Sequence, residues 1–508
     1  MKNSLLVAGI LLLNSIDASA TEPSDLCTGN PCRITKTALL GDGTIDFGAD
    51  TEVRVQSGVT LHLGTPEQAS VSIELVAGRF VLESGARIVA LAKRRDIYPE
   101  RMLTIRALDG SIVTERNSKI DFRGVDDSSS FVWLSATGDV VSLGAIRLAA
   151  KGEEAQAPYL LVQAGGRAQI DGRVSAPATG TYTLGGDVVV EADGDVSIGG
   201  RVDVRGNYGG TVELRSETGS VAIDGFVDAS GRGANAIEAP GLAGEIEVEA
   251  PAGGILVGGI LRARGSAGID ETGEGGSADL RAGTSILIDG RVELGGGAGG
   301  FGGSLDAQAG VDFVQGPASV IEANATPPGL YGMAGFVRIL AGGKGVVRRL
   351  ELSAPSGFGA VAVRADGEIS VDGPVRAFGT GRESGGGYVE LETAGEVRVS
   401  GLVDCSSRGR DGFAGGEVQV KAGSIDLRAS SLVDSRSIAP PFIVGWNRLE
   451  AAGPMTIAGT LRGDRNSLFH RTTPPTITGT VDPAPEIIQI PGSASAAFLE
   501  PSSRSLLD

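Results

Sequence analysis

A unit of three short strands recurs along most of the chain, and this repeat restricts the possible folds more than any other feature. Clear copies begin at or next to Gly209, Ala243, Gly276, Gly386 and Gly415, where Gly-Gly or Ala-Gly pairs recur. Within each strand apolar and polar residues alternate, which is typical of a β-strand with one buried face. Most of the variation in unit length falls after the third strand.

A single unit of three tiny strands cannot bury its apolar positions, but stacked units can, because each strand pairs with its equivalent in the next unit. The repeat therefore predicts an all-β fold, a single-stranded, three-faced parallel β-helix. Weaker copies extend back to Ser70, and the last clear copy begins at Asn447. Counting the starts predicts roughly fourteen coils.

The composition agrees with a thin solenoid. Glycine contributes 80 of the 508 residues, and we expect it at the corners, where the backbone must turn sharply. Aromatic residues make up only 4% of the chain, as expected if a narrow core accepts Val, Ile, Leu and Ala but not large rings. Collagen is excluded because glycine does not recur at every third position.

The first twenty residues predict a cleaved secretory signal peptide. Lys2 supplies the positive start, residues 5–13 are apolar, and Ala18-Ser19-Ala20 resembles a cleavage site. No later segment has the length and apolarity of a transmembrane helix. We therefore expect export to the periplasm, the outer surface or the medium. The remaining chain divides into an N-terminal cap (21–68), the β-helix (69–473) and a proline-rich C-terminal cap or tail (474–508).

Three cysteines fit this picture of an exported protein. Cys27 and Cys32 lie in the sequence CTGNPC, and an oxidising compartment would join them in a disulfide. Cys405 falls at an inward position that Val204, Ala229 and Ala263 occupy in other coils. We expect it to be a small core residue rather than a nucleophile.

The charge balance restricts the partners. Lys and Arg total 44 against 62 Asp and Glu, a net charge of −18. An acidic chain with scattered basic residues argues against nucleic acid and anionic membranes as partners. Extracellular polysaccharide or another surface protein remains as the expected partner.

Two acidic patterns could suggest calcium, although we predict no metal site and no cofactor. Asp-Gly pairs recur at the corner between the second and third strands, at Asp171, Asp224, Asp289 and Asp372, but glycine replaces aspartate in intervening coils. We read them as turn pairs. A loop with Asp270, Glu271 and Glu274 offers oxygen ligands, and calcium there is the weaker alternative.

The strongest candidate for a binding site is the edge where the long loops emerge after the third strand, because loops on a rigid scaffold often carry function. Its candidate residues are Tyr331, Arg382, Glu383, Arg408, Arg410, Asp411, Phe413 and Trp446. Aromatic rings beside arginines and carboxylates could engage sugar rings. The alternative is that the rings pack under their own loops and the charges are solvated.

The cadence Gly-Gly-x-Val-x-Val, Gly-x-Val-x-Val, Gly-x-Val-Asp-x-Ser-Gly over residues 36–470 resembles the passenger regions of filamentous-haemagglutinin-like adhesins and related bacterial surface proteins. This resemblance implies a right-handed helix and an adhesive or surface role. We expect two departures from that family, because the last residues are proline-rich and do not resemble an autotransporter barrel, and no recognisable secretion-system domain precedes the coils.

We therefore expect a secreted or cell-surface, adhesin-like structural protein without catalytic residues. The alternative is a carbohydrate-binding or polysaccharide-degrading β-helix enzyme, which would need clustered carboxylates and a basic residue on adjacent coils. Arg382, Glu383, Arg408, Arg410 and Asp411 form the grouping that such an enzyme could use.

Overall fold

The structure is a computed structural model that describes most of the chain. The described residues are 22–65, 68, 70–90, 100–122, 130–233, 241–266, 273–326, 332–411, 414–438 and 443–491. The proposed signal peptide (1–20) lies outside them. Within this part of the chain, no helix has the length and apolar character needed to cross a membrane.

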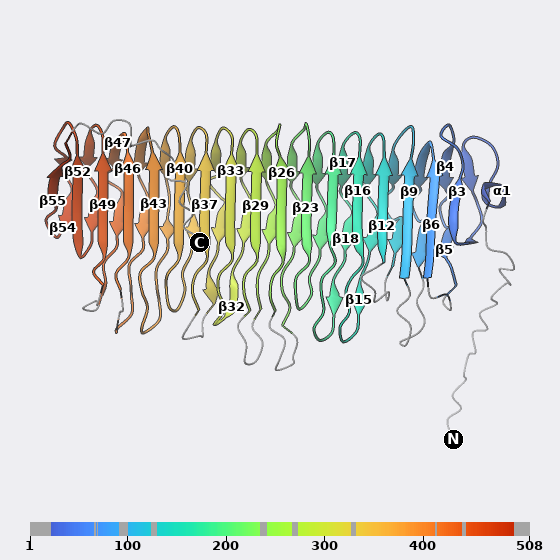
Figure 1. Cartoon of the computed structure of the whole chain (residues 1–508), viewed down its shortest axis with the longest axis horizontal. Helices are drawn as coiled ribbons and strands as arrows, with labels where there is room; N and C mark the ends of the chain where they lie inside the picture. The colour runs from blue at the N-terminus through green and yellow to red at the C-terminus, as the bar shows by residue number, and fades with distance from the viewer. Residues whose placement is uncertain are drawn as a thin grey trace, which may run out of the picture.

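Three parallel sheets of 17 strands each wind into one long β-solenoid, which confirms the predicted fold class (Figure 1). We call them the first, second and third sheets, after the order of their strands in each repeat. The first sheet has the longest strands. Its members are β3 (Gly43–Asp46), β6 (Ser70–Ala77), β9 (Glu100–Ala107), β12 (Phe131–Ala136), β16 (Tyr159–Ala164), β20 (Val188–Ala192), β23 (Thr211–Ser216), β26 (Glu245–Ala250), β29 (Ser277–Ala282), β33 (Ser304–Ala309), β37 (Phe336–Ala341), β40 (Ala360–Ala365), β43 (Tyr388–Thr393), β46 (Glu417–Ala422), β49 (Trp446–Ala451), β52 (Arg465–His470) and β55 (Glu486–Gln489).

The second sheet runs from β1 (Cys32–Ile34) to β53 (Thr476–Ile477), and the third from β2 (Ala38–Leu40) to β54 (Thr480–Asp482). The solenoid thus extends beyond the repeats recognised in the sequence. Strands already pair within the expected N-terminal cap, and strands still pair within the segment 474–508.

Alternating side chains build the core. In β37, for example, Val337 and Ile339 are fully buried, whereas Phe336, Arg338 and Leu340 point outward. The same alternation recurs in register on the neighbouring strands, so inward residues of successive coils stack in columns. Burying these aliphatic columns is the main favourable term for a fold whose coils bury little alone.

The core accepts more aromatic volume than the composition suggested. Phe80, Phe122 and Phe313 are completely buried. Phe313 pairs in register with Gly345 of the next coil. The expectation that the core excludes large rings is therefore wrong at these three positions.

Glycine is required where corners of successive coils touch. A Cβ atom on Gly335 would lie 1.8 Å from the carbonyl oxygen of Gly303, and one on Gly303 would lie 2.0 Å from that of Gly276. No side chain fits at such distances. The predicted role of glycine at corners is confirmed, with close backbone approach as its physical cause.

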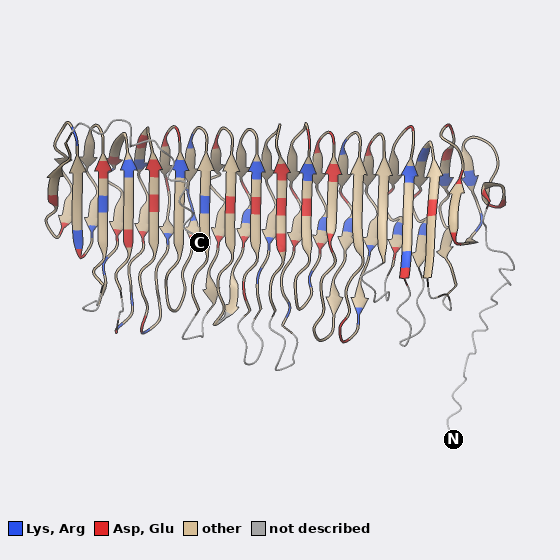
Figure 2. Cartoon of the chain, viewed as in Figure 1, with Lys and Arg blue, Asp and Glu red and all other residues tan. Residues whose placement is uncertain are grey.

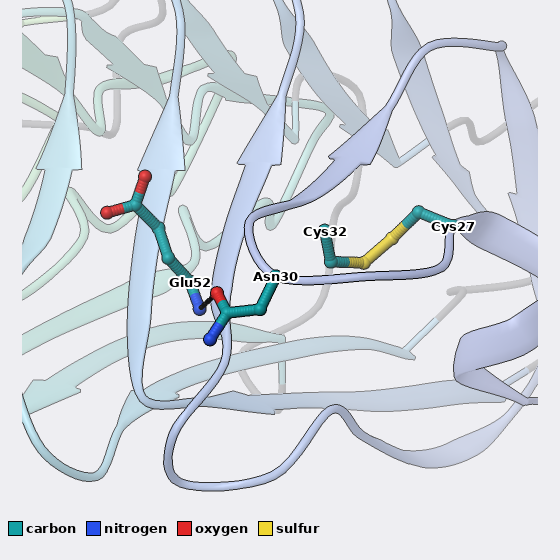
Figure 3. The surroundings of a disulfide bond; sticks show 4 residues. All are labelled: Cys27, Asn30, Cys32 and Glu52. Carbon is teal, nitrogen blue, oxygen red and sulfur yellow. Dashed lines mark hydrogen bonds between the residues drawn. A yellow bond between two sulfur atoms is a disulfide. The ribbon is translucent and has the colours of Figure 1, made fainter.

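The N-terminal end is closed by a short helix and a disulfide. Helix α1 (Pro23–Leu26) is followed by the Cys27–Cys32 bond, which confirms the predicted pairing (Figure 3). Between the two cysteines, the Asn30 side chain accepts a hydrogen bond from the Glu52 backbone N–H at 3.1 Å and donates one to the Asp50 carbonyl at 2.7 Å. These bonds tie the disulfide loop to the following coil.

The long loops leave the solenoid at a single corner, between the third and first sheets. Figure 1 shows that these loops extend below the first sheet, whereas the connections at the opposite edge are short. Two small extensions stiffen some of these loops, β15 (Ala150–Lys151) with β19 (Ala178–Thr179) and β32 (Gly296–Ala298) with β36 (Ala325–Thr326). Variation in repeat length is thus absorbed outside the sheets, as the sequence predicted.

We predict that Gly335→Ala destabilises the solenoid by more than about 2 kcal/mol, because the new methyl group would collide with the preceding coil. Thermal or urea unfolding measures the change. The matched control is Gly295→Ala, whose nearest non-neighbour atom would be 3.2 Å away. Equal losses for both variants would contradict the close-approach argument.

Candidate functional site

The loop edge brings together part of the predicted set. Arg382 and Asp411, from the loops of neighbouring coils, form an ion pair at 2.5 Å, and both side chains are largely exposed. The Asp411 carboxylate raises the pKa of Arg382 by a hydrogen bond and by its charge. Glu383 and Arg410 are also exposed. This is a solvated, charged ridge rather than an enclosed site.

Arg408 belongs to the base of the ridge. Its guanidinium lies 3.9 Å from the centroid of the Phe378 ring and forms an ion pair with the buried carboxylate of Asp404. A cation stacked on an aromatic face and paired with a carboxylate is held in one position. Its charge therefore stabilises the loop that carries it.

Of the remaining predicted residues, Trp446 is part of the described chain. Trp446 is the first residue of β49, so it belongs to the outer face of the first sheet, where its indole N–H donates to the Ser467 hydroxyl at 3.2 Å. Tyr331 and Phe413 lie outside the described residues, as do Asp270 and Glu271 of the proposed calcium loop.

Buried carboxylates anchor the start of the loops. Asp203, at the end of β22 (Arg201–Asp203), is 1% exposed and lies within 3.4 Å of Arg201 and 2.6 Å of Arg205. Burial alone would raise the pKa of Asp203, but the hydrogen bonds and charge of Arg205 and the charge of Arg201 hold it below its ordinary value. Asp203 stacks in register on Asp228 of β25 (Phe226–Asp228), which is equally buried.

A long groove follows the opposite edge of the first sheet, where each strand ends. It has a volume of about 840 Å³ and runs from β23 to β46. Its floor consists largely of alanine–glycine corners, among them Ala309-Gly310 and Ala341-Gly342. A Cβ on Gly310 would lie 2.1 Å from the carbonyl oxygen of Gly283, so this corner cannot carry a side chain. Glycine thus leaves the centre of the floor free of side chains, whereas Pro251, Asp366 and Ala394 occupy the corresponding corners toward its two ends.

One column of outward side chains lines this groove. Its members stack in register and are Arg215, Glu249, Arg281, Gln308, Leu340, Arg364, Glu392 and Lys421. Ion pairs of 3.0–3.5 Å join the charged neighbours at each end, while Gln308 and Leu340 leave the centre uncharged. The groove thus offers an uncharged middle between two zones of mixed charge.

Beside the groove runs a column of carboxylates, visible as red bands on the first sheet in Figure 2. Glu213, Glu247, Asp279 and Asp306 occupy the same position in four successive strands. Burial, followed by the negative charge of Glu247 and nearby glutamates, raises the pKa of Glu213. Burial likewise raises the pKa of Asp279 against the opposing effect of Arg281, with Asp306 and Glu247 adding to the rise. These carboxylates repel one another along the rod.

Other candidate chemistry has a structural explanation. Cys405 is completely buried, as predicted, and burial raises the pKa of its thiol well above the ordinary range. The Asp171 carboxylate lies over Gly199 of the next coil and that of Asp224 over Gly258. Glycine in alternate coils therefore makes room for the Asp-Gly turn. Among the described residues, no group of three or more His, Cys, Asp or Glu side chains could hold a metal ion.

Sequence reasoning identified the loop edge but missed the groove. Part of the signal was present, because an Ala-Gly pair precedes the second strand in several coils, as at Ala282-Gly283, Ala309-Gly310 and Ala341-Gly342. These pairs indicate a groove only when they are known to stack in register. Because loops of unequal length separate them, that register cannot be read from the sequence.

Comparison with known proteins gives no relative from which function could be transferred. No protein-family model matches the chain, and no curated protein or solved structure matches it.

We predict that Asp203→Asn destabilises the protein by about 2 kcal/mol at neutral pH, because it removes the charged acceptor of the Arg205 hydrogen bonds and leaves Asp228 as the buried carboxylate that Arg201 and Arg205 share. The pKa of Asp203 is lowered in the folded state, so its stabilising effect is complete above the ordinary value of 3.8 and is lost as the pH falls below it. The difference between wild type and variant should therefore shrink in acid. Urea unfolding at pH 7 and pH 3.5 measures it, with the exposed Asp171→Asn as control.

Proposed function

We propose that this protein is an exported, adhesin-like binding rod without catalysis, which holds an extended polymer along its side. The observation that carries the proposal is the groove from β23 to β46. At one strand spacing per coil it is roughly 35 Å long. A continuous groove of that length suits a linear polymer better than a compact small molecule.

The chemistry of the groove supports the same function. In its centre Leu340 offers apolar contact and the Gln308 amide offers an uncharged hydrogen-bonding group, while charged pairs at both ends offer hydrogen bonds to a polar chain. Because the lining residues are held in register by the sheet, the site is preorganised and a ligand need not order it. Extracellular polysaccharide or an extended segment of a surface protein would fit these features.

The polysaccharide-degrading alternative gains no specific support from the loop ridge. Arg382 is paired with Asp411 and Arg408 with Asp404. The two arginines are thus engaged in contacts that hold the loops, which explains their position without a role in bond cleavage.

We predict that Gln308→Trp, which fills the middle of the groove, weakens binding of an extended polymer about tenfold or more by excluding it from the floor. Biolayer interferometry with immobilised polygalacturonate and chitosan, two polymers of opposite charge, measures the effect. The control is Gln169→Trp on the second sheet, in β17 (Ala168–Ile170), outside the groove.

Binding of at least one polymer by wild type and by the Gln169 variant, with loss in the Gln308 variant, would support the proposal. Binding that is unchanged by Gln308→Trp would contradict the groove as the site. A fall in viscosity of the polymer solution, with release of shorter chains, would replace the non-catalytic function with the degrading one.

A further inference from the structure

Aromatic side chains form a regular line on the outer face of the first sheet. Phe336, Tyr388 and Trp446 are the first residues of β37, β43 and β49, and each is partly exposed. The strands between them carry Ala360 and Glu417 at the equivalent position. A ring therefore recurs at every second coil, about 10 Å apart along the rod. We call these three residues the aromatic ladder.

Exposed apolar residues accompany the ladder on the loop side. Met333, Phe358, Ile443 and Val444 are 38%, 49%, 56% and 56% exposed, and each lies two or three residues before a first-sheet strand. Phe358 also has a φ of +60°, an unfavourable conformation for a bulky residue. Its ring packs against Gly385 of the next coil, where a Cβ would lie 2.8 Å from the ring. An exposed ring held in a strained conformation indicates a binding role.

Polar side chains run parallel to the ladder, two residues further along each strand. Glu390, Gln419 and Arg448 stack in register beside it. The Tyr388 hydroxyl donates to Glu390 at 3.3 Å, and the guanidinium groups of Arg465 and Arg448 lie 5.5 and 5.9 Å from the centroid of the Trp446 ring. Ring faces thus adjoin a line of hydrogen-bond donors and acceptors. That combination matches a sugar, which has apolar C–H faces and hydroxyl edges.

We propose that the aromatic ladder binds a neutral β-1,4-linked polysaccharide that lies along the rod axis. In such a chain each residue is turned over relative to the one before it, so every second residue presents the same face. The spacing of these faces is close to two strand spacings, which is the spacing of the ladder. The net charge of −18 disfavours an anionic polymer.

This inference names a ligand class for the binding function proposed above but uses the opposite edge of the first sheet. The ladder lies where the strands begin, and the groove lies where they end. An experiment can therefore reject binding at one of these two sites without rejecting binding at the other.

The test compares binding of three oligosaccharides to the full chain by calorimetry: cellohexaose (β-1,4), laminarihexaose (β-1,3) and maltohexaose (α-1,4). Cellohexaose should bind most tightly. Tyr388→Ala should weaken its binding about tenfold, because one stacking contact is lost from the centre of the ladder. The matched control is Tyr159→Ala, which removes the same residue type from the equivalent position of β16, outside the ladder.

A double variant tests the spacing itself. Tyr388→Ala combined with Ala360→Tyr keeps the number of rings but moves the central ring by one coil. It should bind cellohexaose as weakly as Tyr388→Ala alone. Thermal unfolding confirms that both variants are folded.

A local signal locates the ligand. The chain has two tryptophans, Trp133 and Trp446. In a Trp133→Phe background, cellohexaose should change the fluorescence of Trp446. Equal binding of all three oligosaccharides, restored binding in the double variant or unchanged Trp446 fluorescence would overturn the proposal. Loss of cellohexaose binding in Gln308→Trp with normal binding in Tyr388→Ala would place the glycan in the groove and overturn the ladder alone.

Discussion

Every other feature of this molecule depends on the parallel backbone pairing between successive coils. In each of the three sheets a strand is hydrogen-bonded to its equivalents in the neighbouring coils, so equivalent residues stack in register at one strand spacing. Buried valines, corner glycines, carboxylates and aromatic rings all become columns. The surface therefore repeats with every coil, and its chemistry depends on which residue each coil places at a given position.

The fold could be predicted because the repeated sequence shows the two things that a β-solenoid requires, an apolar inward face on each strand and sharp turns between strands. Alternation such as that of Val212 and Leu214 with Glu213 defines the inward face, and glycine pairs mark the corners. The final strands were not recognised, since Pro474, Pro475 and Pro483 interrupt the pattern around β53 and β54. The backbone nevertheless continues to pair there, because the prolines fall outside the strands.

The binding surfaces could be predicted only in part. The loop edge follows from where repeat length varies, and the contact of Arg382 with Asp411 shows that neighbouring loops do meet. The relation of Phe336 to Tyr388 and Trp446 is different, because their separations in sequence include loops of unequal length. Only the strand register shows that they occupy one line. Outward strand residues also look like an ordinary solvated face until their neighbours across the coils are known.

The loops and the sheets can change independently, since the loops leave the rod at one corner only. Residues can be added to a loop without moving any column of strand residues. The length and sequence of a loop are therefore not restricted by the register between strands. Removal of a whole coil has the opposite effect. It leaves the stacking of the core residues unchanged but moves all later coils by one strand spacing. A surface pattern that repeats every two coils is then interrupted at the site of the deletion. The surface pattern of such a rod is therefore preserved only when coils are gained or lost in pairs. The core pattern, which repeats in every coil, is preserved even when a single coil is gained or lost.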